Sequence, residues 1–206
     1  MKNIIPILKP LLRPFDKLRA SGVDESARGE PVEPFRRIHQ LRRRSIIDLT
    51  HTFTKSMPVH SLDDAPTIEK IRNLTDNKYN DWKLTSWMHV GTHIDGPGHF
   101  TDSKIVFSDI TADRFVGKGV LIDARNKAID SSLLKDLPAE EGLIVLILTG
   151  FDKKFGTDEY FNNHPVISAD FARELVKRNV KMVGMDLFSP DNYPFEVHKI
   201  FLSLKI

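Results

Sequence analysis

The apolar positions are most regular in the C-terminal half of the chain, where they predict alternating strands and a helix. Residues 143–149 form one continuous apolar run, which is typical of a buried strand. Residues 169–177 carry apolar side chains at helical spacing, and Ser168 precedes them as an expected N-cap. Residues 181–186 predict a further strand. This strand–helix–strand order favours an α/β fold.

Weaker patterns predict the remaining elements. Residues 62–82 are polar and irregular, and we expect them to form a long loop that covers a site. The other expected elements are strands at 46–49, 84–95 and 116–123, and a short helix at 131–136 capped by Ser131.

Composition adds a basic arm to this picture. The 206 residues, 40% of them hydrophobic, suffice for one core, which we place at 45–206. Residues 1–44 carry a net charge of +6 and the remainder −4. The arm lacks periodicity, has few aromatic residues and resembles translated bacterial intergenic repeats. We therefore expect a poorly ordered segment foreign to the domain, with no role in binding nucleic acid.

Cysteine is absent, which excludes disulfides and thiolate metal sites and suits the cytoplasm. No apolar run approaches the roughly 20 residues that span a bilayer. Pro6, Lys9 and Pro10 interrupt the apolar start, so we expect neither a signal peptide nor a membrane segment.

Candidate chemistry is concentrated between residues 89 and 99. Three histidines, His89, His93 and His99, lie there with Asp95. Imidazole and carboxylate are the ligands that suit zinc and manganese. A lone histidine is usually a surface or core residue, but this combination favours a metal site.

An extended chain would place residues 89, 91, 93 and 95 on one face. Gly91, without a side chain, would leave room there for an ion between His89 and His93. Gly96, Pro97 and Gly98 predict a sharp turn that brings His99 back beside the same ion.

The residues from His89 to His99 resemble the signature of the putative cyclase family, which includes bacterial kynurenine formamidase and isatin hydrolase. The resemblance extends from about Asp48 to the C-terminus. Its weaker supporting segments are Asp48–His51, Met57–Val59, Leu148–Phe151, His164 with Pro165, Val183–Asp186 and His198–Leu202.

The resemblance implies a compact α/β fold with a mixed, barrel-like central sheet and flanking helices, usually in a homodimer. It implies one or two divalent ions, Zn²⁺ or Mn²⁺. The first would be bound by His89, His93 and Asp95, and the second by Asp95 and His198. His99 would be the catalytic base and acid.

The implied activity is hydrolysis of a small-molecule amide by metal-activated water. N-formylkynurenine, cleaved to kynurenine and formate in tryptophan catabolism, is the leading substrate, and a cyclic amide such as isatin is the alternative. The family's formamidase branch has a Glu near position 210, beyond Ile206, and residues 57–64 lack its Trp-Pro-Gly-Asp pattern. We therefore expect a C-terminally truncated member, and an inactive metal-binding protein is a further alternative.

Other polar and aromatic residues have weaker claims to the site. His51 follows an expected strand and would lie near the site, and His164 is expected to order a turn. Asp186 would either touch the site or cap a turn. Packing is the favoured role for Trp82, Trp87 and Phe100, with an aromatic substrate pocket as the alternative. His60 is expected to be exposed, and His39 belongs to the arm.

Overall fold

The computed structural model describes residues 47–203. The chain divides into two units, Met1–Leu49 and Thr50–Ile206, and every helix and strand described below belongs to the second. The predicted basic arm at 1–44, including His39, lies outside the described residues.

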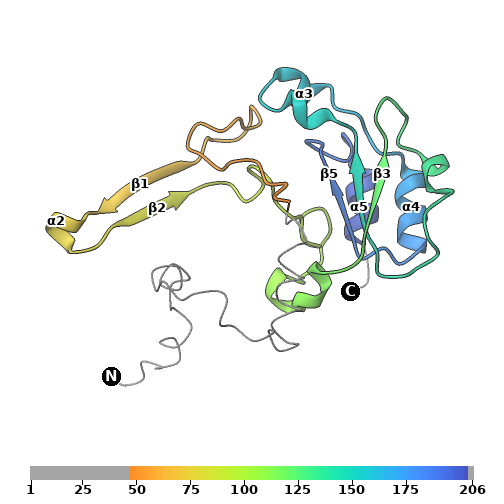
Figure 1. Ribbon diagram of the computed structural model, residues 1–206, viewed down its shortest axis with the longest axis horizontal. Coiled ribbons are helices and arrows are strands. Elements are labelled where there is room, and N and C mark those ends of the chain that lie inside the picture. Colours follow the sequence, from red (N-terminus) through yellow and green to blue (C-terminus); the bar gives the residue numbers. More distant parts are fainter. Residues whose placement is uncertain (1–46, 204–206) are drawn as a thin grey trace, which may run out of the picture. The chain divides into compact units, whose positions relative to one another are not determined.

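A three-stranded parallel sheet forms the centre of the second unit (Figure 1). Its strands are β3 (Gly119–Asp123), β4 (Ile144–Leu148) and β5 (Met182–Met185), in the order β3-β4-β5. The register pairs Gly119 with Ile144, and Ile144 with Met182. The continuous apolar run at 143–149, predicted to be a buried strand, contains the central strand β4.

The core lies between this sheet and two helices, α4 (Ala169–Lys177) and α5 (Glu196–Leu202). These helices pack together, and Figure 1 shows them beside the sheet. Ser168 caps α4 as predicted, because its Oγ accepts a hydrogen bond from the Phe171 backbone N–H at 3.4 Å. Val145 and Phe171 are fully buried in the shared core.

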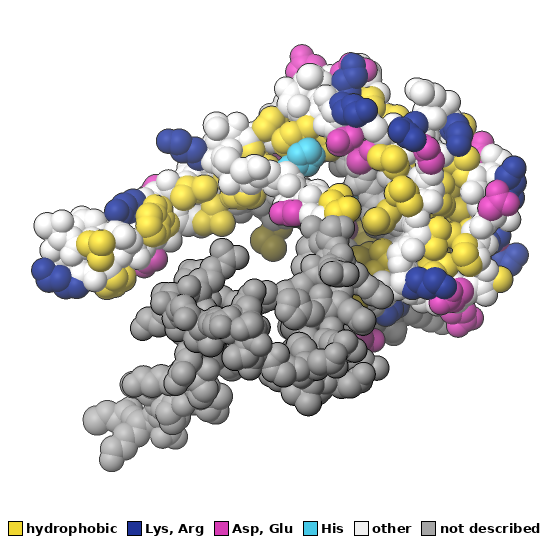
Figure 2. All heavy atoms as spheres, viewed as in Figure 1, with side chains coloured by type: hydrophobic (Ala, Val, Ile, Leu, Met, Phe, Trp, Pro, Cys, Tyr) yellow, Lys and Arg dark blue, Asp and Glu magenta, His cyan; other side chains and the backbone are white. Residues whose placement is uncertain are grey.

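A β-hairpin occupies the stretch that the sequence predicted to be a loop. Strands β1 (Thr67–Arg72) and β2 (Asp81–Thr85) pair antiparallel, with the short helix α2 (Leu74–Asn77) between them. Most of the hairpin's side chains are exposed (Figure 2), so no buried face marked it in the sequence. The loop prediction for 62–82 was therefore wrong over most of its length.

Short helices complete the second unit. They are η3 (Phe107–Asp109), η4 (Ala112–Phe115), η5 (Ser131–Leu134), η6 (Phe151–Lys154) and α3 (Asp158–Asn162). The helix predicted at 131–136 is η5, but its cap is Asp130, whose carboxylate accepts the Ser132 backbone N–H, and not Ser131.

Two strand predictions were wrong. Residues 47–49 are not a strand, and after β2 ends at Thr85 the chain from 86 to 99 is irregular. Gly91 has a φ of +72°, a left-handed conformation that interrupts the alternation of side chains in a strand. The strand predicted at 116–123 begins only at Gly119.

The α/β class is confirmed, but the barrel-like sheet is not. Within residues 47–203 the sheets are the open three-stranded sheet and the hairpin, without a closed barrel. In the same residues, no helix combines the length and apolar character needed to cross a membrane.

Candidate metal centre

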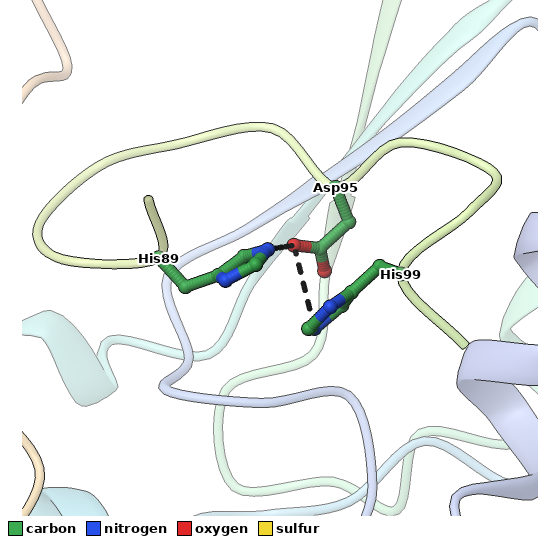
Figure 3. Close-up of side chains that lie close together, drawn as sticks. All are labelled: His89, Asp95 and His99. Carbon is green, nitrogen blue, oxygen red and sulfur yellow. Dashed lines mark ion pairs between the residues drawn. The ribbon is translucent and has the colours of Figure 1, made fainter. Parts of the chain in front are cut away.

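The loop between β2 and η3 holds His89, His93, Asp95 and His99, whereas His198, the remaining predicted ligand, lies in α5. Figure 3 shows His89, Asp95 and His99 close together. The predicted turn at Gly96 is confirmed, since the His99 backbone N–H donates to the Gly96 carbonyl at 3.0 Å. The Thr101 hydroxyl donates to the Pro97 carbonyl at 2.5 Å and closes the same turn. This turn carries His99 back toward Asp95.

Asp95 is the centre of the cluster. Its Oδ1 atom lies 3.3 Å from Nε2 of His93, 3.5 Å from Nε2 of His89 and 4.0 Å from Nε2 of His99. Its Oδ2 atom lies 4.0 Å from Nε2 of His198, more than one hundred residues further along the chain. One carboxylate therefore faces four imidazoles.

The charges in the cluster shift the pKa values of its members. Burial alone would raise the pKa of the Asp95 carboxyl, but the neighbouring His93 ring, with His99 and His89, outweighs burial and lowers it. Asp95 in turn raises the pKa of His93, against the effect of burial. Burial lowers the pKa of His99 against the opposing effect of the Asp95 carboxylate, and the positive charges that His89 and His198 would carry lower it further.

The geometry fits a metal ion. Two ligands with bonds of about 2.1 Å to one tetrahedral ion lie about 3.4 Å apart. The separations of Asp95 Oδ1 from His93 and His89, 3.3 and 3.5 Å, match this value. Oδ1 is also buried without a hydrogen bond of good geometry, which is costly unless another group completes its coordination. A divalent cation would do so.

His93 is oriented by the backbone. Its Nδ1 atom lies 2.8 Å from the Gly91 carbonyl oxygen, which can only accept a hydrogen bond. With the proton on Nδ1, the lone pair of Nε2 is free and faces Asp95.

The structure groups the predicted residues somewhat differently from the sequence. Donor atoms of His89, Asp95 and His99 all lie within 4.8 Å of one another, whereas His93 approaches Asp95 from outside this set. The rings of His89 and His99 stack with centroids 3.9 Å apart. The distances therefore fit either His93 or His99 as the third ligand, with the other as the catalytic base.

Gly91 does not make room for an ion, contrary to the sequence-based interpretation. A Cβ atom at this position would lie 2.8 Å from Cε of Met57, so that space holds a methionine methyl group. The positive φ favours glycine here, and the Met57 methyl group would have to shift to admit a Cβ atom.

The residues with weaker claims to the site lie in different surroundings. His51 stacks on Phe155, and its backbone N–H donates to the Thr92 hydroxyl within the histidine loop. Asp186 caps the end of β4: its carboxylate accepts the backbone N–H groups of Thr149 and Gly150 and the Thr149 hydroxyl.

His164 is buried, and neither of its ring nitrogens has a hydrogen bond of good geometry. Its ring lies edge-on to Phe188, on whose face His60 stacks. None of these contacts places His164 or His60 beside Asp95.

The candidate aromatic residues differ in their surroundings. Phe100 packs against the ring of His198, with centroids 4.2 Å apart, and against His99. Trp82 and Trp87 are more than half exposed.

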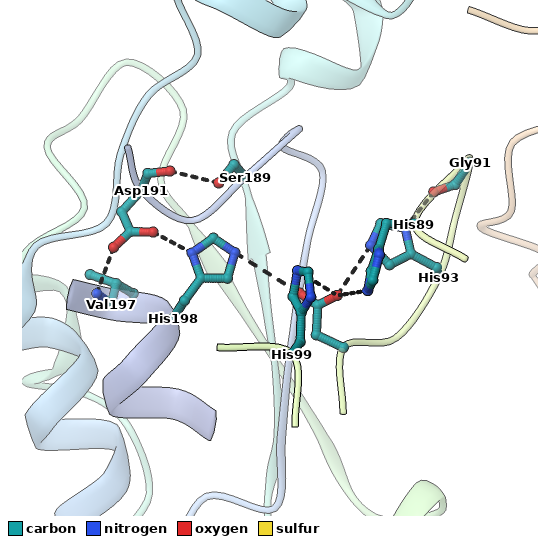
Figure 4. A network of polar contacts seen from close by, with 9 residues as sticks. His89, Gly91, His93, His99, Ser189, Asp191, Val197 and His198 are labelled. Atoms are coloured by element: carbon teal, nitrogen blue, oxygen red, sulfur yellow. Dashed lines mark hydrogen bonds and ion pairs between the residues drawn. The ribbon is translucent and has the colours of Figure 1, made fainter. Parts of the chain in front are cut away.

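Sequence reasoning missed Asp191. This buried carboxylate is hydrogen-bonded to Nδ1 of His198 and accepts the Val197 backbone N–H at 2.6 Å (Figure 4). A carboxylate seven residues before a candidate ligand is not marked by spacing alone, because the link depends on where α5 begins.

Comparison with known protein families identifies the family of this chain. The family model described as Putative cyclase matches residues 47–192, which is more than half of the sequence. The chain belongs to this family.

Curated relatives agree with the match. An uncharacterized protein of Methanocaldococcus jannaschii is 39% identical over 119 residues, which cover 57% of this chain and 56% of that protein. A kynurenine formamidase of Erythrobacter litoralis is 25% identical over 150 residues, which cover 72% of this chain and 68% of the enzyme. The chain thus spans about half to two thirds of the length of these relatives.

Solved structures share the fold. Isatin hydrolase A from Labrenzia aggregata, bound to benzyl benzoate, aligns with a TM-score of 0.67 and 23% identity over 81% of each chain. A structure described as a potential metal-dependent hydrolase with cyclase activity aligns with a TM-score of 0.64 and 22% identity over 76% of each chain.

Proposed function

We propose that this chain is a metal-dependent hydrolase of amide bonds. The observation that carries the proposal is the Asp95 carboxylate, whose two oxygens lie 3.3–4.0 Å from the Nε2 atoms of four histidines. The similarity to a kynurenine formamidase and to solved hydrolases supports the reaction class.

The donor set suits Zn²⁺ or Mn²⁺, because it offers imidazole nitrogens and a carboxylate without thiolate. In this proposal His89, His93 and Asp95 hold one ion, and Asp95 with His198 holds a second. When bound, such an ion lowers the pKa of water and polarises a carbonyl oxygen.

His99 is the proposed general base and acid. Its ring is partly exposed, lies beside Asp95 and has a pKa lowered by burial, which keeps a proton-accepting nitrogen available near neutral pH. It takes a proton from the attacking water. As the C–N bond breaks, it returns the proton to the leaving nitrogen, so that carboxylate and amine are released.

N-formylkynurenine is the proposed substrate, hydrolysed to formate and kynurenine. The similarity to a kynurenine formamidase supports it. Isatin, a cyclic amide, is the second candidate, supported by the similarity of the fold to isatin hydrolase A.

The test is hydrolysis of both compounds by protein loaded with Zn²⁺ or Mn²⁺. Turnover of N-formylkynurenine that stops on chelation and returns with metal is the expected result. Bound metal without turnover of either compound would contradict the hydrolase proposal and favour a non-catalytic metal-binding protein.

We also propose a homodimer. One face of the hairpin carries the exposed apolar residues Ile68, Trp82 and Leu84, with the Lys70 ammonium over the Trp82 ring. Contiguous exposed apolar side chains are typical of protein interfaces. Two copies of the hairpin would cover each other's apolar face.

A further inference from the structure

Asp191 is a buried acid whose contacts lead to the metal centre. Its exposed fraction is 8%. One carboxylate oxygen is hydrogen-bonded to Nδ1 of His198, and the other accepts the Val197 backbone N–H at 2.6 Å. Its own carbonyl oxygen accepts the Ser189 hydroxyl at 2.6 Å. The side chain is therefore held at both oxygens, and the backbone beside it is held as well.

These contacts fix the ring of His198. The Val197 N–H lies in the first turn of α5, the helix that carries His198, so Asp191 holds both the helix start and the ring. Phe100 and Phe195 pack on the same ring. The opposite nitrogen, Nε2, faces Oδ2 of Asp95 at 4.0 Å. Figure 4 shows this continuous line from Asp191 through His198 to the histidine loop.

The chemistry of the contact decides which nitrogen can bind metal. Because a carboxylate accepts hydrogen bonds, it favours the proton of His198 on Nδ1 and leaves the Nε2 lone pair free. The Gly91 carbonyl does the same for His93, but it is neutral. An anionic partner makes the opposite nitrogen a stronger donor than a carbonyl does.

We propose that Asp191 is a positioning residue that holds His198 as the Nδ1–H tautomer, with Nε2 directed at the ion shared with Asp95. This inference rests on the proposed metal site and adds a residue that acts through His198. Replacing a residue that orients a metal ligand in this way typically weakens metal binding about 10–100-fold.

The test compares Asp191→Asn with Asp170→Asn. Asp170 is the control, since its carboxylate also accepts a distant backbone N–H, that of Ser131, and within residues 47–203 it forms no hydrogen bond or ion pair with a histidine. Calorimetric titration of each full-length protein with Mn²⁺ should give about 10–100-fold weaker binding for Asp191→Asn and unchanged binding for Asp170→Asn. Equal affinities for the two variants would overturn the proposal.

A double variant separates positioning from a general effect on folding. In a His198→Ala background, Asp191→Asn should cause no further loss of Mn²⁺ affinity, because the ring through which it acts is gone. A further loss of the same size would show that Asp191 does not act through His198.

A measurement on the metal-free protein tests this inference independently of the proposed function. Long-range ¹H–¹⁵N spectra of the metal-free protein, recorded well above the usual imidazole pKa, report the tautomer of each histidine. His198 should carry its proton on Nδ1 in the wild type, whether or not Mn²⁺ binds. A proton on Nε2 would overturn the proposal even if the metal site is real.

Discussion

At the scale of single residues, Asp95 determines what the histidine loop can bind. Its carboxylate faces the loop histidines through Oδ1 and His198 through Oδ2. The surrounding imidazoles lower its pKa despite burial, so the group is anionic at neutral pH and ready to coordinate a cation.

The role of His99 can be separated from metal binding by substitution. His99→Ala should lower turnover about 10²–10⁴-fold, the usual contribution of a general acid–base group. Mn²⁺ affinity should change little, since His89, His93 and Asp95 remain. Steady-state kinetics and calorimetry on the same preparation check both quantities. A His99→Ala protein that loses its metal together with its activity would make His99 a ligand instead.

Gly91 offers a prediction about stability. Gly91→Ala places a Cβ atom 2.8 Å from Met57 at a φ of +72°. Left-handed strain of about 1–2 kcal/mol and overpacking of about 1–3 kcal/mol should together lower the free energy of unfolding by about 2–5 kcal/mol.

The control for this substitution is Gly142→Ala, at a φ of +71° with no atom within 4 Å of the added Cβ. It should cost only the strain, about 1–2 kcal/mol. Urea unfolding of both variants measures the difference. Equal losses would mean that Met57 does not limit the space at Gly91.

At the scale of elements, the hairpin β1–β2 carries the prediction about assembly. Replacing Ile68 and Leu84, which are cross-strand partners, by Lys should convert the proposed dimer to monomers, because each copy would bring two ammonium groups into the shared face. Light scattering after size-exclusion chromatography measures the mass. Val166→Lys, at another exposed apolar position, is the control and should stay dimeric. A monomeric wild type, or a dimeric double variant, would contradict the prediction.

The elements that sequence predicted well are those with local signals. The apolar run of β4 and the Ser168 cap of α4 need only neighbouring residues to be recognised. The hairpin escaped prediction because most of its side chains are exposed, so its strands have no buried face. The strand predicted at 84–95 ends at Thr85, and further along Gly91 has a positive φ that does not fit an extended strand.

Within the candidate site, too, the residues that could be predicted are those close together in the sequence. His89, His93, Asp95 and His99 lie within eleven residues, and the turn at Gly96 brings the last of them back. His198 was implied only by family resemblance. Asp191 depends on the start of α5, a tertiary feature that no spacing rule supplies.

At the scale of the whole molecule, the parallel sheet and α5 bring distant parts of the sequence to one carboxylate. The loop after β2 supplies three histidines and Asp95, and α5 supplies His198 from within the core. Metal binding should therefore stabilise the second unit as a whole, since the ion would join the loop to the core.

The most direct test of this account is the binding of Mn²⁺ to chelator-treated protein, measured by calorimetry for the wild type and for Asp95→Asn. Asp170→Asn, a carboxylate replacement outside the cluster, is the control. The wild type and the control should both bind Mn²⁺. Asp95→Asn should lose affinity beyond roughly 100-fold, the upper range for residues that only orient ligands. No binding by the wild type, or equal binding by Asp95→Asn, would contradict a metal centre built on Asp95.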